Sequence, residues 1–155
     1  MSLEIERKFL VKKCVDFDKL AFRKIDICQG YLSVDPDLTV RLRICDDSAF
    51  ITVKTRNHGA VRNEWEYPIP VDDARQMLER AHVKTIVKTR YLLDVDNHIW
   101  EVDIFGGSLH GLIIAEVELR DAKEKLTLPD FVETEVTGNP VYYNSNLIGA
   151  RYPIE

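Results

Sequence analysis

Charged side chains alternate with apolar ones along several segments of this sequence. The first such segment opens the chain, where Glu4, Glu6 and Lys8 are spaced two residues apart. Side chains with this spacing lie on the same face of a β-strand. A strand here would present two carboxylates and an amine to one side. Carboxylate oxygens suit Mg²⁺ or Mn²⁺, and Lys and Arg suit phosphate oxygens.

The same spacing recurs further along the chain, so that seven of the eight strands predicted below carry a charged row. Any one row is typical of a solvated sheet face. Together, however, the rows group acids on the first, seventh and eighth strands and bases on the third, fourth and sixth. The rows are Glu4, Glu6 and Lys8; Arg41 and Arg43; Thr52, Lys54 and Arg56; Arg62, Glu64 and Glu66; Lys88 and Arg90; Glu101 and Asp103; and Glu116 and Glu118.

Two arrangements of these rows are open if the sheet closes into a barrel. With the charges outward, the interior is apolar and the molecule resembles a lipocalin-like carrier. With the charges inward, the barrel is a charged tunnel, which is stable only if acids, bases, metal ions and ligand neutralise one another. A polyanionic phosphate chain with divalent cations fits such a tunnel.

The elements that position these rows are mainly strands, so we predict a mainly β (α+β) fold with an eight-stranded antiparallel closed barrel and a few helices outside. Helices are predicted at 16–23, at 71–81 with Asp72 or Asp73 as N-cap, and near 140–148. The tail helix could plug one tunnel end or pack on the barrel surface. The predicted strands span 2–11, 28–34, 38–45, 48–56, 61–69, 84–94, 98–106 and 112–120.

Composition narrows the class of protein. The chain has 155 residues, 45% hydrophobic and 30% charged, which favours a single domain over 1–155. A net charge of −5 argues against nucleic-acid binding. No apolar run is long enough for a membrane span, the acidic start resembles no signal peptide, and the three cysteines are scattered. We therefore expect a cytoplasmic protein without membrane association. No glycine-rich phosphate loop is present.

The ordered set of motifs resembles the CYTH family, also called triphosphate tunnel metalloenzymes. The resemblance covers nearly the whole chain. The matching pieces are Glu4-Ile5-Glu6-Arg7-Lys8, Gln29-Gly30-Tyr31-Leu32, Arg41-Leu42-Arg43, Thr52-Val53-Lys54, Gly59 with Arg62, Glu64 and Glu66, Lys88-Thr89-Arg90-Tyr91, Trp100-Glu101-Val102-Asp103, Glu116-Val117-Glu118, Glu135-Val136-Thr137, and Tyr142 with Asn144 and Leu147.

This resemblance implies an inward-charged tunnel that hydrolyses a triphosphate chain with Mg²⁺ or Mn²⁺. The short opening motif looks most like that of bacterial inorganic triphosphatases, which release phosphate and diphosphate by water attack on a terminal phosphoryl group. The alternatives are a class IV-type adenylate cyclase, a thiamine or nucleoside triphosphatase, and a non-catalytic polyphosphate binder. A homodimer is compatible with the apolar outer faces.

Roles are expected residue by residue. Neighbouring cations could depress the pKa of Lys8 and make it a base, and Glu6 is the other candidate base. Arg7 shares parity with Ile5 and should lie outside the tunnel. The expected metal ligands are Glu4, Glu6, Asp103, Glu116 and Glu118; the catalytic set is Lys8, Glu6 and Tyr31; the phosphate-binding set is Lys8, Arg41, Arg43, Lys54, Arg90, Lys88 and Arg56; and the supporting set is Arg62, Glu64 and Glu66.

Overall fold

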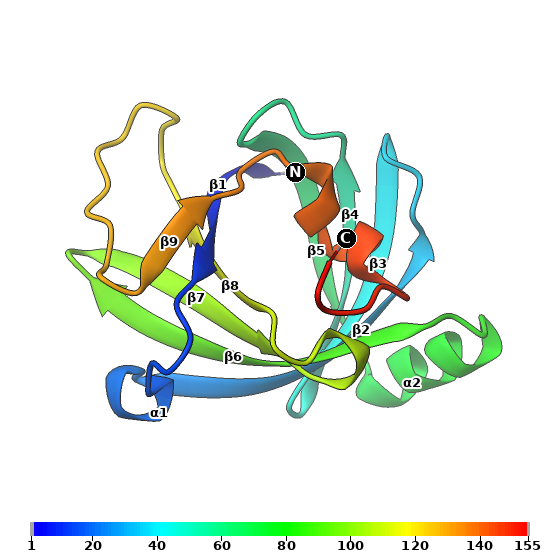
Figure 1. Cartoon of the computed structure of the whole chain (residues 1–155). Coiled ribbons are helices and arrows are strands. Elements are labelled where there is room, and N and C mark those ends of the chain that lie inside the picture. The colour runs from blue at the N-terminus through cyan, green and yellow to red at the C-terminus, as the bar shows by residue number, and fades with distance from the viewer. Residues whose placement is uncertain (1, 155) are drawn as a thin grey trace.

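One strongly curved antiparallel sheet forms the body of the protein (Figure 1). The computed structural model describes residues 2–154, and within them no helix is long and apolar enough to cross a membrane. In chain order the elements are β1 (Ser2–Val11), α1 (Phe17–Leu20), β2 (Arg23–Ser33), β3 (Leu38–Cys45), β4 (Ser48–Thr55), β5 (Val61–Ile69), α2 (Val71–Arg80), β6 (Thr85–Val95), β7 (His98–Phe105), η1 (Gly107–Leu109), β8 (Ile113–Glu118), β9 (Val132–Glu135), η2 (Pro140–Tyr142) and α3 (Asn144–Leu147).

Eight of these strands close into a barrel, as the charge pattern predicts. They follow the order β5-β4-β3-β2-β6-β7-β8-β1, and β1 then pairs with β5 to complete the ring. β5 covers only the first part of β1, where Glu4 lies opposite Arg62. Beyond it β9, which the sequence analysis did not predict, pairs with β1 at Phe9 and Val11. β9 has only four residues, Val-Glu-Thr-Glu, so its alternation is too short to stand out.

Three predicted boundaries are wrong. β2 begins at Arg23 instead of residue 28, because Ile25 and Ile27 already alternate with polar residues and pair with β6. The predicted helix 16–23 therefore ends at Leu20. α2 begins after Pro70, so Asp72 and Asp73 lie in its first turn instead of capping it. Carboxylates in that turn still favour the helix dipole.

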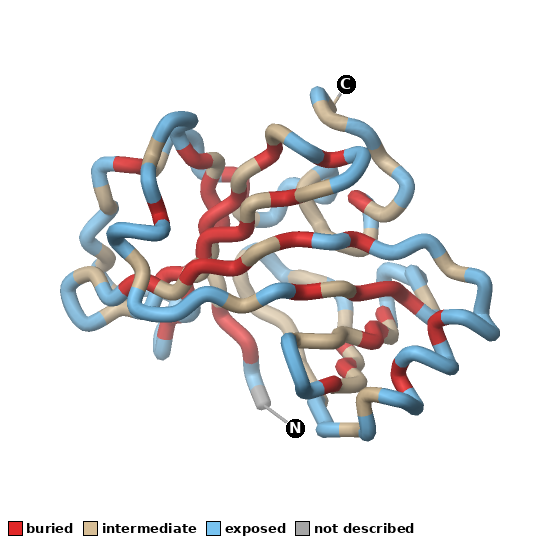
Figure 2. Tube along the Cα trace, turned by 90° about the horizontal axis from the view of Figure 1, so that it is seen from below, coloured by how far each residue is buried: buried red, intermediate tan, exposed pale blue. Residues whose placement is uncertain are grey.

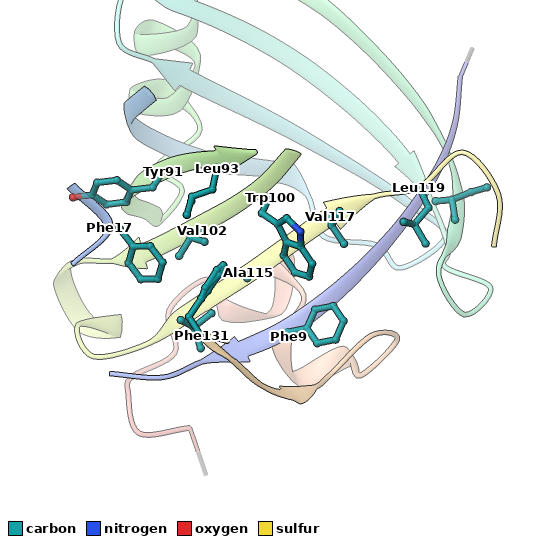
Figure 3. Packing of buried hydrophobic residues seen from close by; sticks show 12 residues of the cluster. Phe9, Phe17, Tyr91, Leu93, Trp100, Val102, Ala115, Val117, Leu119 and Phe131 are labelled. Carbon is teal, nitrogen blue, oxygen red and sulfur yellow. The ribbon is translucent and has the colours of Figure 1, made fainter. Parts of the chain in front are cut away.

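The apolar side chains form a core on the outside of the barrel wall. Trp100 is fully buried and packs against Phe9, with ring centroids 5.5 Å apart, and against Phe131, at 6.2 Å (Figure 3). Phe131 comes from the segment after β8, and Phe17 of α1 packs edge-on against it at 5.3 Å. A helix and a loop thus cover the face that a lipocalin-like barrel would turn inward. The outward-charge arrangement is therefore wrong. Figure 2 shows that buried residues gather where the chain segments run side by side, whereas the peripheral loops are exposed.

The C-terminal segment closes one end of the barrel. In Figure 1 the orange and red segment lies across the opening that the strands surround. Inward positions at this end are apolar, and Leu147 is inserted among Ile86, Phe105 and Ile114 with only 1% of its surface exposed. The predicted helix over 140–148 is interrupted at Tyr143, whose backbone is extended. Of the two tail arrangements predicted, the structure has the plug.

Removal of the Phe131 ring should weaken the outer core. Because the ring is buried between Phe17 and Trp100, Phe131→Ala should lower the free energy of unfolding by about 3 kcal/mol. Urea unfolding measures the change. Leu128→Ala, at a half-exposed position of the same loop, is the matched control and should change stability by less than about 0.5 kcal/mol. Equal effects of the two variants would contradict the packing described.

Candidate active site

The charged rows meet in a cavity of about 250 Å³ inside the barrel. The acids of β7, β8 and β1 lie on adjacent strands and form an acidic wall, and the bases of β3 and β4 form a basic wall, whereas the bases of β6 lie next to acidic β7. The cavity is lined by Glu4, Glu6, Tyr31, Thr39, Arg41, Arg43, Lys54, Arg62, Glu64, Glu66, Arg90, Glu101, Glu116, Glu118, Tyr143, Asn144 and Ser145.

Glu4 is held between two bases. Its Oε1 lies 3.0 Å from Lys54 Nζ and its Oε2 lies 3.1 Å from Arg62 Nε. Burial alone would raise the pKa of Glu4, but Lys54 and Arg62 outweigh it and lower the pKa. Lys54 also pairs with Glu64 at 3.2 Å. Arg62 and Glu64 thus form ion pairs with the cavity residues Glu4 and Lys54.

Asp103 is enclosed by bases. Arg90 donates to its two oxygens from Nε at 2.7 Å and Nη2 at 2.9 Å, and Lys88 Nζ donates to Oδ2 at 2.6 Å. Burial would raise the pKa of Asp103, yet Arg90 and Lys88 hold it well below its usual range. Asp103 and Lys88 lie behind the cavity wall, whereas Glu101, which pairs with Arg90, faces the cavity. A metal ion bound by Asp103 would have to displace one of these bases.

Lys8 lies under the tail at the closed end. Its Nζ donates to the carbonyl of Tyr142 at 3.0 Å and lies 3.4 Å from Glu116 Oε1. Burial would lower its pKa, but Glu116 and Glu6 outweigh burial and raise it. The expectation that neighbouring cations depress the pKa of Lys8 is therefore wrong, because its nearest charged neighbours are carboxylates. Lys8 is held as a protonated donor.

Two arginines of β3 retain unused donor capacity. Arg43 Nε donates to Gln29 Oε1 at 2.7 Å, and Arg43 forms no ion pair within the described residues. Burial, reinforced by Arg41 and Arg90, lowers its pKa to about 10. Arg41 Nη2 donates to Thr52 at 3.1 Å and to Glu66 at 3.4 Å, but its buried Nε has no partner. Buried N–H donors usually have a hydrogen-bond acceptor. The unpartnered Nε of Arg41 is therefore available to donate to a bound anion.

The acidic wall can accept a cation. Burial raises the pKa of Glu6 to about 8, and the neighbouring carboxylates Glu116 and Glu4 add to the shift. Within residues 2–154 no three acidic, His or Cys side chains converge at metal-binding separations. The donor chemistry still fits a hard divalent ion, since these groups are oxygen ligands whose mutual repulsion a cation would relieve. Glu118, opposite Glu6 on β8, adds another carboxylate.

Some residues lie elsewhere than expected. Arg56 is outside the tunnel wall, because β4 ends at Thr55 and the exposed guanidinium of Arg56 pairs with Asp37 at 2.6 Å. Arg7 lies outside the tunnel, as predicted, and pairs with Glu135 of β9 at 2.7 Å. The sequence analysis missed Tyr143, Asn144 and Ser145 as cavity residues. No strand alternation marks them, because their place depends on how the tail docks.

A second cavity, of about 900 Å³, adjoins the charged cavity and shares Arg90, Glu101 and Glu118 with it. Its other residues include the apolar side chains Ile25, Ile27, Cys45, Leu92 and Ile99. The first four occupy inward positions near the ends of β2, β3 and β6, away from the plug. The charged cavity is thus bounded by the tail on one side and by a wider, partly apolar space on another.

Comparisons with known proteins agree with this geometry. Residues 2–143 match the CYTH domain. An inorganic triphosphatase of Acetivibrio thermocellus is 41% identical over 153 residues, which cover 98% of this chain and 97% of the relative. An inorganic triphosphatase of Nitrosomonas europaea is 34% identical over 148 residues, 93% of this chain and 95% of the relative. The crystal structure of the inorganic triphosphatase NE1496 superposes with a TM-score of 0.67 at 32% identity and covers 97% of both chains.

The raised pKa of Glu6 predicts how the stability of the metal-free protein varies with pH. Because the folded pKa is about 8 and the ordinary value 4.5, the stabilising contribution is complete below pH 4.5 and is lost as pH rises through 8. Glu6→Gln, which cannot ionise, should remove this decline in urea unfolding measured with a chelator between pH 5 and 9. Glu133→Gln, on exposed β9, is the control. An unchanged pH profile in Glu6→Gln would show that Glu6 titrates normally.

Proposed function

The chain belongs to the CYTH family, and on that basis we propose that its tunnel hydrolyses inorganic triphosphate to diphosphate and phosphate with a divalent cation. The observation that carries this proposal is the basic wall, where Arg41 Nε is buried without a partner and Arg43 has no acidic partner in the described chain. Burial of cations in this way costs free energy unless a bound anion neutralises their charge. A triphosphate supplies several negative charges close together. The two relatives named inorganic triphosphatase support this choice of ligand.

Phosphate binding falls to the bases that face the cavity. We assign Arg41, Arg43, Lys54 and Arg90 to direct contact, since they line it, and guanidinium groups match phosphate oxygens with paired donors. Lys8 and Lys88 do not line the cavity. We propose that their positive charges act on the phosphate chain from the closed end, Lys88 without direct contact because its side chain is 0% exposed. Phosphoryl transfer depends mainly on such positioning and charge neutralisation.

The acidic wall is proposed to hold the cation. Glu4, Glu6, Glu116 and Glu118 are the proposed ligands. Asp103, the fifth expected ligand, would join them only by releasing Arg90 or Lys88. A bound Mg²⁺ or Mn²⁺ would neutralise phosphate charge and polarise the reacting phosphoryl group. The oxygen-only donor set suits either ion.

Water activation is assigned to Glu6. Its pKa is near 8 without a cation. A nearby cation would lower this pKa and bring it closer to the working range of a general base. Lys8, being protonated, is better suited to donating a proton or hydrogen bond to the phosphate than to removing a proton from water. Tyr31 lines the same cavity and could orient the water.

Organic triphosphates are a second candidate substrate class, and the adjoining cavity favours them. Its apolar residues Ile25, Ile27 and Leu92 could contact the organic part of a nucleoside or thiamine triphosphate whose phosphates enter the charged cavity. The cyclase alternative would use the same space.

We also propose a homodimer, a cytoplasmic location and a single domain over 1–155. The exposed apolar side chains Tyr67 and Leu38 support the homodimer.

Phosphate release tests this function directly. Inorganic triphosphate, ATP and thiamine triphosphate should each be incubated with Mg²⁺ and with Mn²⁺. We expect the highest kcat/KM with inorganic triphosphate and no turnover in a chelator, because the cation neutralises the substrate. Formation of cyclic AMP from ATP would favour the cyclase, and binding without phosphate release under either metal would favour a non-catalytic binder.

Two arginines at neighbouring strands provide a matched test of the basic wall. Arg43→Ala removes a cation from the cavity and should lower kcat/KM for inorganic triphosphate on the order of 10²–10³-fold. Arg56→Ala removes an exposed cation outside the tunnel and should leave kcat/KM within about twofold of wild type. Steady-state phosphate release measures both. Comparable losses would mean that Arg56 reaches the substrate.

A further inference from the structure

Asn144, the first residue of α3, connects a buried lysine with the tunnel cavity. Its Oδ1 accepts a hydrogen bond from Lys88 Nζ at 3.3 Å, and Asn144 lines the cavity beside Tyr143 and Ser145. On its other side Lys88 donates to Asp103 at 2.6 Å, and its side chain is 0% exposed. Asn144 therefore contacts both the enclosed Lys88 and the cavity.

The chemistry of Lys88 fixes which way the Asn144 amide points. An ammonium group only donates hydrogen bonds, so the amide atom that faces it is the oxygen. The NH₂ group is then the part of the side chain that remains for the cavity. Within residues 2–154, Nδ2 of Asn144 makes no hydrogen bond. A neutral amide donor is thus held at the closed end of the tunnel.

Other contacts hold the tail in place. Leu147 is buried in the apolar end of the barrel, the carbonyl of Tyr142 accepts from Lys8 Nζ, and Thr137 Oγ1 accepts from the backbone N–H of Lys8 at 2.9 Å. The location of Asn144 is therefore largely set by neighbours on both sides of it. The tail does not depend on the Asn144 amide alone for its position. The amide is therefore available to bind a ligand.

We propose that Asn144 is a substrate-binding residue whose Nδ2 donates a hydrogen bond to a non-bridging oxygen of the phosphate at the closed end of the tunnel. This inference rests on the proposed triphosphatase function and adds to it a contact from outside the strand rows. The donor adds no charge next to Lys88, so it costs no repulsion. The same geometry lets Lys88 and Asp103 orient a group that touches the substrate while both remain buried.

Asn144→Asp separates substrate binding from tail anchoring. Aspartate keeps the oxygen that accepts from Lys88 and keeps nearly the same shape, but it has no N–H to offer phosphate. Asn144→Ala removes the donor without adding a negative charge. Asn139→Asp is the control, because Asn139 is exposed on the same tail and its Oδ1, which accepts from the Val141 N–H, is retained by aspartate. Phosphate release from inorganic triphosphate is measured together with hydrogen exchange of residues 140–147.

We expect kcat/KM to fall on the order of 10-fold to 100-fold in both Asn144 variants, since hydrogen bonds to charged groups are worth that much. Asn144→Asp should keep the wild-type exchange protection of the tail, and Asn139→Asp should keep wild-type activity. Wild-type kcat/KM in Asn144→Asp would overturn the proposal, as would an activity loss accompanied by loss of tail protection, because Asn144 would then act only by anchoring. If the wild type released no phosphate, the triphosphatase function would fail. Calorimetric titration with inorganic triphosphate would still test Asn144, through weaker binding by Asn144→Asp than by Asn139→Asp.

Discussion

Neutralisation of charge inside a closed barrel is the constraint on which the rest of this structure depends. Asp103 illustrates it, because a carboxylate with 2% exposure is stable only through the three donated hydrogen bonds from Lys88 and Arg90. Glu4 has such basic partners, whereas Glu118 has a raised pKa instead. The basic wall is less complete, since Arg43 and part of Arg41 lack acidic partners. Because these arginines lack acidic partners, the tunnel can bind an anion.

An interior filled with charge requires the hydrophobic core to lie elsewhere. The outward faces of β1, β6, β7 and β8 supply it, and α1 together with the segment around Phe131 covers it. This explains why a short chain carries a long, irregular excursion between β8 and β9. The excursion is needed because a single-layer barrel with a polar interior cannot bury its apolar face by itself. Stability and function are therefore separated between the two faces of one sheet.

The tail links these two faces. It brings Leu147 into the apolar end of the barrel and places polar side chains of residues 143–145 beside the charged cavity. Arg7 contributes from outside, since its pairing with Glu135 fixes β9 just before the tail turns toward Lys8. The opening strand thus acts on both surfaces. Glu4, Glu6 and Lys8 face the tunnel, and Ile5, Arg7 and Phe9 belong to the outer layer.

The sequence by itself determined the barrel and the two walls of the tunnel. Alternation along a strand fixes which side chains share a face, and that local rule is sufficient for rows such as Arg41 and Arg43. It could not determine which members of a row reach the cavity. Glu101 and Asp103 have the same parity, yet only the packing of Lys88 and Arg90 decides that Asp103 is enclosed and Glu101 faces the cavity. The pKa of Lys8 likewise depended on Glu116, which comes from another strand.

Only the tertiary structure decided where β9 and the tail lie. Four residues of β9 carry too little periodicity to be recognised. Asn144 belongs to a tail motif, but the motif does not place it beside the cavity, because its place follows from the docking of Leu147. Arg56 had the parity of the tunnel residues but lies past the end of β4, where parity no longer has a physical basis. The sequence therefore predicts side-chain direction only where local backbone geometry sets it, which is within a strand. Beyond the end of a strand, the packing of distant segments determines where a side chain points.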